Sequence, residues 1–226
     1  MPERRFLDKQ KPANKRHESR FDLRRYILIV CEGEKTEPNY FRSFPLAPHS
    51  VVEVVGSGEN TLSLVRTALE YRKQHPYDQV WCVFDRDTFP VNNFNSALEL
   101  ARKNDIQVAY SNEAFELWYI LHFHYLDTGI TRQDYCDLLG EKQYLGRTYN
   151  KNSKTIFAEL KNRQETAIRN AERLLTQYNP PNPAYDKPST TVHLLVKELQ
   201  NLRQPFWEDE NSDRGKNGPP RNRKRL

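Results

Sequence analysis

Four short apolar runs of strand length are separated by segments with helical spacing of apolar residues. The runs are rich in β-branched residues, and their unbroken apolar character indicates strands buried on both faces. They lie at residues 26–31, 51–55, 80–84 and 106–110. Between them, apolar residues recur every three or four positions, at residues 38–44, 62–69 and 94–101. Strand and helix therefore alternate along the first half of the chain.

This alternation predicts an α/β fold with a mainly parallel, four-stranded sheet and right-handed crossovers. After about residue 113 the pattern becomes helical, with helices expected at 114–123, 132–139, 153–178 in one or two pieces, and 189–202. The last of these would begin with Ser189 and Thr190 as its N-cap, directly after Pro188. We expect an α/β core over residues 25–125 and a helical extension over residues 126–205 that packs on it.

The basic charge is concentrated at the two ends of the chain. The 226 residues hold 35 Lys or Arg and 30 Asp or Glu, a net charge of +5. Residues 1–25 hold nine basic and four acidic residues, and residues 208–226 hold six and four, which leaves 20 basic and 22 acidic residues between them. We expect basic flexible tails at 1–24 and 206–226, of a kind that can contact phosphate backbones, around a slightly acidic body.

The length and the cysteines narrow the class of protein. A chain of 226 residues suits one domain with tails. No apolar run approaches the roughly 20 residues of a membrane-spanning helix, and the N-terminus has no hydrophobic signal region, so a cytoplasmic protein without membrane contact is expected. Cys31, Cys82 and Cys136 form no CxxC pair, and the first two fall inside apolar runs, where they are interpreted as core residues.

Acidic residues crowd the ends of two predicted strands. Glu32, Glu34 and Glu37 follow the first strand in a turn that Gly33 permits, and the sequence Asp85-Arg86-Asp87 follows the third. In a parallel sheet these positions meet at the carboxyl edge, where ligands bind. Carboxylates held this close repel one another unless they are protonated or neutralised by a cation.

An all-oxygen donor set favours Mg²⁺ or Mn²⁺ over zinc. The acids that would hold the ion are Glu32, Asp85 and Asp87, with Glu34 or Glu37 as further candidates. The alternative is that each acid caps a helix or pairs with Lys or Arg on a solvated rim. Two sets of acids on separate strand ends favour the metal interpretation.

These residues resemble two known patterns. A glutamate after the first strand and a DxD after the third resemble the signature of the Toprim fold, which is found in topoisomerases, primases and OLD-family nucleases. The closer similarity is to the RloB-like family, over roughly residues 25–203. It is carried by IVCEGEKTEPNYF at 29–41, VFDRD at 83–87, SN at 111–112 with FELW at 115–118, and PSTTV at 188–192.

The resemblance implies a Toprim-like, metal-dependent nuclease of bacterial anti-phage defence or abortive infection that works beside an ATPase encoded nearby. It makes Glu32 a metal ligand or general base, and Asp85 and Asp87 ligands of Mg²⁺. OLD-type nucleases place a second acid four residues after the first glutamate, where this chain has Thr36. Glu34 and Glu37 are the candidates to replace it.

Further candidates lie outside the two acidic turns. Glu116 interrupts an apolar helical run, and a buried carboxylate needs a partner or a metal. Lys151 is a candidate for stabilising transition-state charge, or is an ordinary surface lysine. Gly56 and Gly58 follow the second strand. The backbone amides of their turn are candidates for binding a phosphate, or the glycines serve only to form the turn. Lys35 and Arg86, next to the acids, complete the phosphate candidates. His122 and His124 are two apart, which argues against a metal pair.

The leading hypothesis is metal-dependent hydrolysis of a nucleic-acid phosphodiester, in RNA or DNA. Two alternatives stay open. One is a HAD-type phosphohydrolase with Asp85 as nucleophile, since Asp85-Arg86-Asp87-Thr88 also fits a DxDxT motif. The other is a non-catalytic adaptor derived from the Toprim fold that binds nucleic acid or an ATPase. Assembly into a homo-oligomer is compatible with each of them.

Overall fold

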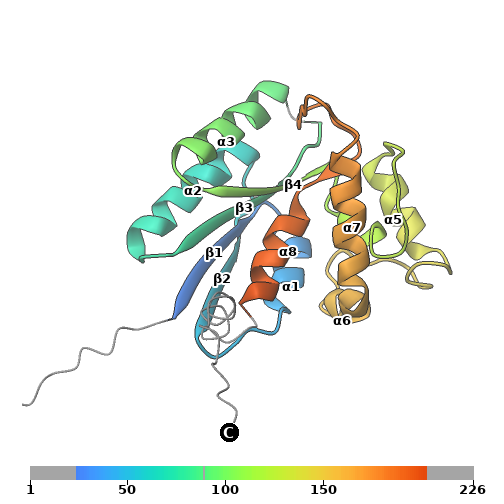
Figure 1. Ribbon diagram of the computed structural model, residues 1–226, viewed down its shortest axis with the longest axis horizontal. Helices are drawn as coiled ribbons and strands as arrows, with labels where there is room; N and C mark the ends of the chain where they lie inside the picture. Colours follow the sequence, from blue (N-terminus) through green and yellow to red (C-terminus); the bar gives the residue numbers. More distant parts are fainter. Residues whose placement is uncertain (1–23, 89, 203–226) are drawn as a thin grey trace, which may run out of the picture.

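A five-stranded sheet forms the centre of the computed structural model, which describes residues 24–88 and 90–202 (Figure 1). The strand order is β2-β1-β3-β4-β5. The first four strands pair in parallel, and β5 pairs antiparallel with β4. Their bounds are β1 Arg25–Cys31, β2 Ser50–Gly56, β3 Gln79–Asp85, β4 Gln107–Asn112 and β5 Ser189–Thr190.

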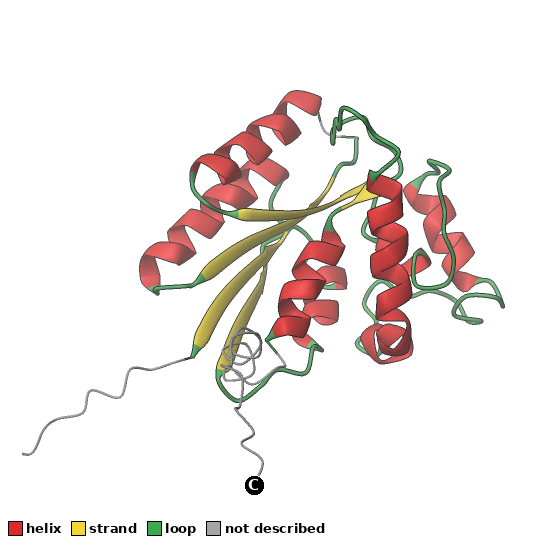
Figure 2. Cartoon of the chain, in the orientation of Figure 1, coloured by secondary structure: helices red, strands yellow, loops and turns green. Residues whose placement is uncertain are grey.

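Helices cover both faces of this sheet (Figure 2). Two of them, α2 (Thr61–Gln74) and α3 (Val91–Lys103), lie on one face. The other face carries α1 (Thr36–Arg42) and α8 (Val192–Asn201), with the remaining helices packed beyond them. Those helices are α4 Glu116–Ile120, α5 Arg132–Gly140, α6 Ile156–Leu160, the 3₁₀ helix Lys161–Arg163 and α7 Gln164–Leu175.

The period of two along each strand divides the core in two. On β1, Ile27 and Ile29 face the core shared with α1, α4 and α8, whereas Leu28 and Val30 face α2 and α3. All four side chains are essentially inaccessible to solvent. Burial on both faces is the reason these strands are continuously apolar. The expected parallel four-stranded arrangement is thus confirmed and extended by one strand.

The second half of the chain differs from the prediction in two places. Ser189 and Thr190 do not cap a helix: they form β5, and α8 begins at Val192. Both are fully buried, and the Thr190 hydroxyl donates to the Tyr110 carbonyl at 2.9 Å, so that edge pairing takes the place of the cap. The helix expected at 114–123 is only α4, which ends at Ile120 and is followed by turns.

The basic tails expected at 1–24 and 206–226 lie, apart from Arg24, outside the described residues. Among the helices of residues 24–88 and 90–202, none has the length and apolar character needed to cross a bilayer.

Candidate active site at the carboxyl edge of the sheet

The two acidic turns lie at the topological switch point of the sheet, between the adjacent strands β1 and β3. Strand β1 has β2 on one side and β3 on the other, so the loops that leave β1 and β3 turn to opposite faces and leave a crevice between them. Glu32 directly follows β1, and its amide donates to the Val83 carbonyl at 2.9 Å. Asp85 ends β3. The two acids therefore meet at the position where open α/β sheets bind ligands.

Glu32 and Asp85 are joined by a hydrogen bond. The Asp85 amide donates to Glu32 Oε2 at 3.0 Å, which holds the Glu32 side chain across the edge of the sheet. Asp85 itself is only 8% exposed. Burial raises the pKa of Glu32 to about 7, against the lowering effect of that hydrogen bond. Burial, followed by the Glu37 carboxylate, raises the pKa of Asp85 well above its ordinary value.

Glu37, on the first turn of α1, turns back under the Glu32 loop. It is 6% exposed, and its Oε2 has no hydrogen-bond partner within the described residues. Burial, together with the nearby Glu116 and Glu32 carboxylates, raises its pKa to about 7. Glu34, by contrast, is exposed. Of the two replacements proposed for the acid missing at Thr36, the structure brings Glu37 into the acidic group and leaves Glu34 outside it.

Gly33 makes this position of Glu37 accessible. A Cβ atom added to Gly33 would lie 2.1 Å from Glu37 Oε2 and 2.9 Å from its Cδ. The Gly33→Ala substitution should therefore push the carboxylate out of the cluster; because the clashing atoms are the end of a flexible side chain, it should lower the free energy of unfolding by only about 1 kcal/mol at pH 4.5, where Glu37 is protonated. Chemical denaturation of purified protein measures this loss. Gly140→Ala is the matched control, because its added Cβ would meet only the Arg147 carbonyl oxygen at 3.8 Å; equal losses in both variants would contradict the prediction.

Glu116 joins the group from α4. It is 3% exposed, and its Oε1 accepts a hydrogen bond of 3.1 Å from the Tyr149 hydroxyl. Lys151 Nζ lies 3.6 Å from the same oxygen. The Lys151 loop is fixed to the start of α1, since the Thr36 hydroxyl donates to the Lys151 carbonyl at 3.1 Å. Both weaker candidates, Glu116 and Lys151, thus belong to the same site.

Arg132 is the residue at this site that sequence reasoning missed. Its Nη2 lies 3.1 Å from Asp85 Oδ2 and 3.6 Å from Asp87 Oδ2. The main chain behind it is fixed, because Thr131 and Asp134 form a capping box at the start of α5, and the Arg132 amide donates to Glu113 Oε1 at 3.2 Å. The guanidinium therefore bridges the two aspartates of the DxD motif. No sequence signal ties an arginine 45 residues downstream to that motif.

The raised pKa of Glu37 predicts a pH-dependent stability. Its folded-state pKa, about 7, exceeds the ordinary value of 4.5, so the folded protein holds its proton more tightly and stability falls as pH rises from about 4.5 to 8. Without metal, Glu37→Gln should be more stable than the wild type at pH 8.5, by up to about 3 kcal/mol, and similar to it below pH 4.5. Urea unfolding in EDTA measures this difference. The exposed Glu141→Gln should show no such dependence, and a Glu37→Gln variant less stable at pH 8.5 would contradict the argument.

The donor set fits a hard divalent cation in its chemistry. It consists of carboxylate oxygens alone, most of them buried, with one buried oxygen still unpartnered. The side chains are not arranged for metal binding in the present structure. Within residues 24–88 and 90–202, no three His, Cys, Asp or Glu side chains lie close enough together to hold a metal ion. Arg132 on the two aspartates and the Asp85 amide on Glu32 hold these oxygens instead. Binding an ion would require these contacts to be exchanged.

The other phosphate candidates are engaged elsewhere or solvent-exposed. The Ser57 and Gly58 amides donate to the carbonyls of Cys31 and Glu32, both at 3.0 Å, so the Gly56–Gly58 turn ties β2 to the Glu32 loop. An added Cβ on Gly56 would lie 2.7 Å from the Glu34 Cα, which explains the glycine there. Arg86 donates to the carbonyls of Ala184 and Asp87. Lys35 is exposed beside the site. Phosphate binding by these residues stays a prediction.

Comparison with known protein families identifies the family to which the chain belongs. The family model described as RloB-like protein matches residues 27–199, which include every acidic residue of the site. The chain belongs to the RloB-like family. No curated protein and no solved structure matches it. The site of this RloB-like protein is therefore described from its own geometry.

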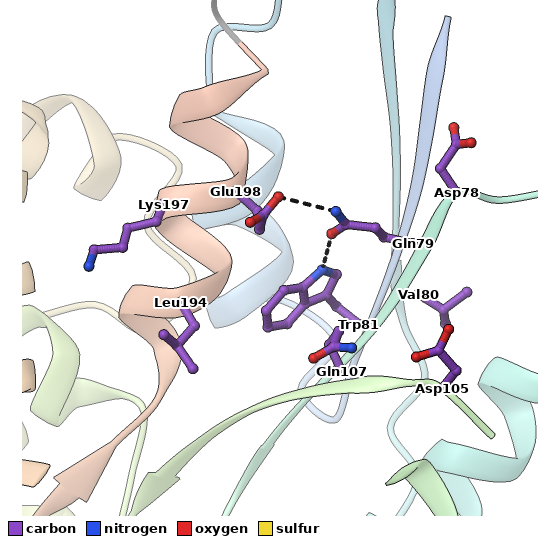
Figure 3. A pocket seen from close by; sticks show the side chains of 9 residues that line it. All are labelled: Asp78, Gln79, Val80, Trp81, Asp105, Gln107, Leu194, Lys197 and Glu198. Atoms are coloured by element: carbon purple, nitrogen blue, oxygen red, sulfur yellow. Dashed lines mark hydrogen bonds between the residues drawn. The ribbon is translucent and has the colours of Figure 1, made fainter. Parts of the chain in front are cut away.

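A cavity of about 430 Å³ lies at the opposite end of the sheet (Figure 3). It is lined by the first residues of β3 and β4 and by Leu194, Lys197 and Glu198 of α8. Gln79 connects two of its walls, donating to Glu198 Oε2 at 3.1 Å and accepting from the Trp81 indole at 2.9 Å. Since it opens at the amino ends of the parallel strands, this cavity is separate from the carboxylate site of the RloB-like protein.

Proposed function

We propose that this RloB-like protein hydrolyses phosphodiester bonds of a nucleic acid with Mg²⁺ or Mn²⁺. The observation that carries the proposal is a group of mutually interacting carboxylates at the strand-order reversal, with a buried, unpartnered oxygen among them. Such a concentration of negative charge destabilises the fold unless a cation offsets it. The members are Glu32, Glu37, Asp85, Asp87 and Glu116.

In this proposal, Glu32, Asp85 and Asp87 hold one ion, and Glu37 and Glu116 supply oxygens for a second. A bound divalent ion would polarise the scissile phosphate and lower the pKa of an attacking water. Without metal, burial raises the pKa of Glu32 to about 7; a bound ion would lower that pKa and keep the carboxylate ionised as its ligand. The role of the chain is to position these oxygens at the edge of a rigid sheet.

Two cations complete the proposed machinery. Arg132 contacts the DxD aspartates, and Lys151 lies 3.6 Å from Glu116. Both reach the acidic group from loops or helix starts outside the sheet, and 40–47% of each side chain is exposed, which leaves room to turn toward a bound phosphate. There they would offset the charge that develops on the phosphate oxygens in the transition state.

The biological setting of the proposal comes from the family resemblance. It comprises RNA or DNA as substrate, an ATPase partner encoded nearby and a role in anti-phage defence. A HAD-type phosphohydrolase with Asp85 as its nucleophile would not explain why Glu37 and Glu116 are buried beside Asp85. An adaptor without catalysis would have no reason to keep the destabilising carboxylates.

The test is cleavage of labelled RNA and DNA by the full chain, with Mn²⁺, with Mg²⁺ or with EDTA, and with the ATPase added in parallel. We expect cleavage that EDTA abolishes and that the Glu32→Gln variant loses. Cleavage that persists in EDTA or in Glu32→Gln would overturn the mechanism. A phosphorylated Asp85 trapped from a phosphomonoester would favour the alternative hydrolase, and nucleic-acid binding without cleavage under all conditions would favour the adaptor.

A further inference from the structure

One aromatic side chain stands out into solvent on the turn that leads to β5, next to a residue that contacts Arg86 of the DxD motif. Tyr185 is 67% exposed, more than any other large hydrophobic side chain in the described part of the chain, where Leu194 follows at 43%. Within the same residues its ring and hydroxyl make no hydrogen bond or ring contact. A single exposed tyrosine on a flexible loop would need no explanation. Whether Tyr185 has a binding role therefore depends on how firmly the surrounding turn is held.

The turn that carries Tyr185 is firmly held. Its neighbours Ala184 and Asp186 are both buried, at 4% and 7% exposed. The Tyr185 and Asp186 amides both donate to the Asn182 carbonyl, at 2.8 and 2.9 Å, and the Asp186 carboxylate accepts from the Asn182 amide at 2.7 Å. The Asn112 side chain, at the end of β4, donates to the Asp186 carbonyl at 2.9 Å. With both neighbours fixed, the Tyr185 side chain is presented outward from a rigid base.

Two separate connections tie this turn to the DxD motif. On one side, Arg86, which lies between the two aspartates, donates from Nε to the Ala184 carbonyl at 3.0 Å. On the other side, Lys187 pairs with Glu113, whose second oxygen accepts from the Arg132 amide, and Arg132 contacts both aspartates. In the sequence, Tyr185 lies between Ala184 and Lys187, the two residues that make these contacts. In Figure 1 the loop that leads to β5 rises beside the end of β4, at the carboxyl edge of the sheet.

We infer that Tyr185 is a stacking platform for an unpaired base of the nucleic acid whose backbone lies at the carboxylate site. The inference rests on the proposed function and narrows its substrate to a single-stranded or unstacked nucleotide. A base inside a duplex has both faces covered by its neighbours, whereas an unpaired base offers a free face to an aromatic ring. Because the backbone that carries Tyr185 is fixed and the side chain has only two rotatable bonds, little conformational entropy is lost when a base stacks on its ring. The polar hydroxyl lets the ring remain exposed to water when no base is bound.

The experiment measures binding without cleavage. In the Glu32→Gln background of the full chain, the affinity for a fluorescent 12-nucleotide single-stranded oligonucleotide is compared with that for the same oligonucleotide made abasic and for a duplex. Tyr185→Ala should weaken binding of the single strand about 5- to 100-fold. Tyr185→Trp should keep or improve it. Leu194→Ala, an exposed apolar residue at the opposite end of the sheet, should leave it unchanged.

The abasic strand separates stacking from general loss of binding. Its affinity should be the same with and without Tyr185, because it offers no base to stack. Equal affinities of Tyr185→Ala and its parent for the single strand, or equal losses on the abasic strand and the duplex, would overturn the inference. Cleavage by the wild type with no effect of Tyr185 would leave the proposed nuclease intact and remove only the platform. Base-dependent binding through Tyr185 without any cleavage would keep the platform and remove the nuclease.

Discussion

The Asp85→Asn variant is expected to lose metal-dependent cleavage by about 10³-fold or more while remaining folded. Asp85 is 8% exposed, lies at the end of a central strand, and interacts with Glu32, Glu37 and Glu116. Asparagine keeps its shape but removes the charge that would hold the ion, a change worth several kcal/mol in the transition state. In the metal-free fold the substitution weakens the pair with Arg132 but also relieves burial of a charge and repulsion by the Glu37 carboxylate, so stability should change little.

Initial cleavage rates in Mn²⁺ and the thermal midpoint in EDTA check this expectation together. The matched control is Asp137→Asn, an exposed aspartate of α5 that accepts a hydrogen bond only from Gln133 among the described residues. It should retain both rate and stability. If Asp85→Asn kept more than a tenth of the wild-type rate, or if it unfolded at room temperature, Asp85 would be a structural residue and not a metal ligand.

The Arg132→Met variant is expected to bind Mn²⁺ at least about tenfold more tightly than the wild type, and yet to cleave more slowly. The guanidinium contacts Asp85 Oδ2 and Asp87 Oδ2, at 3.1 and 3.6 Å, and so occupies the place of a cation between them. An ion must compete with this charge for the same oxygens. Once displaced from the aspartates, Arg132 would be able to contact a phosphate held at the ion, which is why its removal should slow the reaction.

Calorimetric titration with Mn²⁺ measures the affinity. In EDTA, Arg132→Met should also unfold at a lower temperature, because the two aspartates lose their counter-charge. Arg147→Met removes the same charge from the pair with Glu159, away from the carboxylates, and should change neither property at the site. Weaker Mn²⁺ binding by Arg132→Met would mean that the arginine supports the metal-binding geometry rather than competing with the ion.

The local sequence pattern was sufficient to predict those features that depend on a single strand or turn. The four parallel strands were predicted within two residues of their observed ends, because burial on both faces writes an unbroken apolar run into the sequence. Glu32 and Asp85 were placed together by the rule that carboxyl ends of parallel strands share one edge. The edge strand β5 was missed because two residues show no periodicity, and Thr190 fits an N-cap as well as it fits a strand.

The sequence by itself therefore determined the α/β class, the RloB-like relationship and the acidic edge of the sheet, since each depends on residues close together in the chain. Only the tertiary structure decided which of Glu34 and Glu37 joins the acidic group, and which cation meets the DxD motif. Glu37 was selected over Glu34 because α1 turns it under the Gly33 loop. Arg132 was selected because the start of α5 is fixed beside β3. Both choices depend on contacts between segments distant in the chain, which hydrophobic spacing and local motifs do not encode.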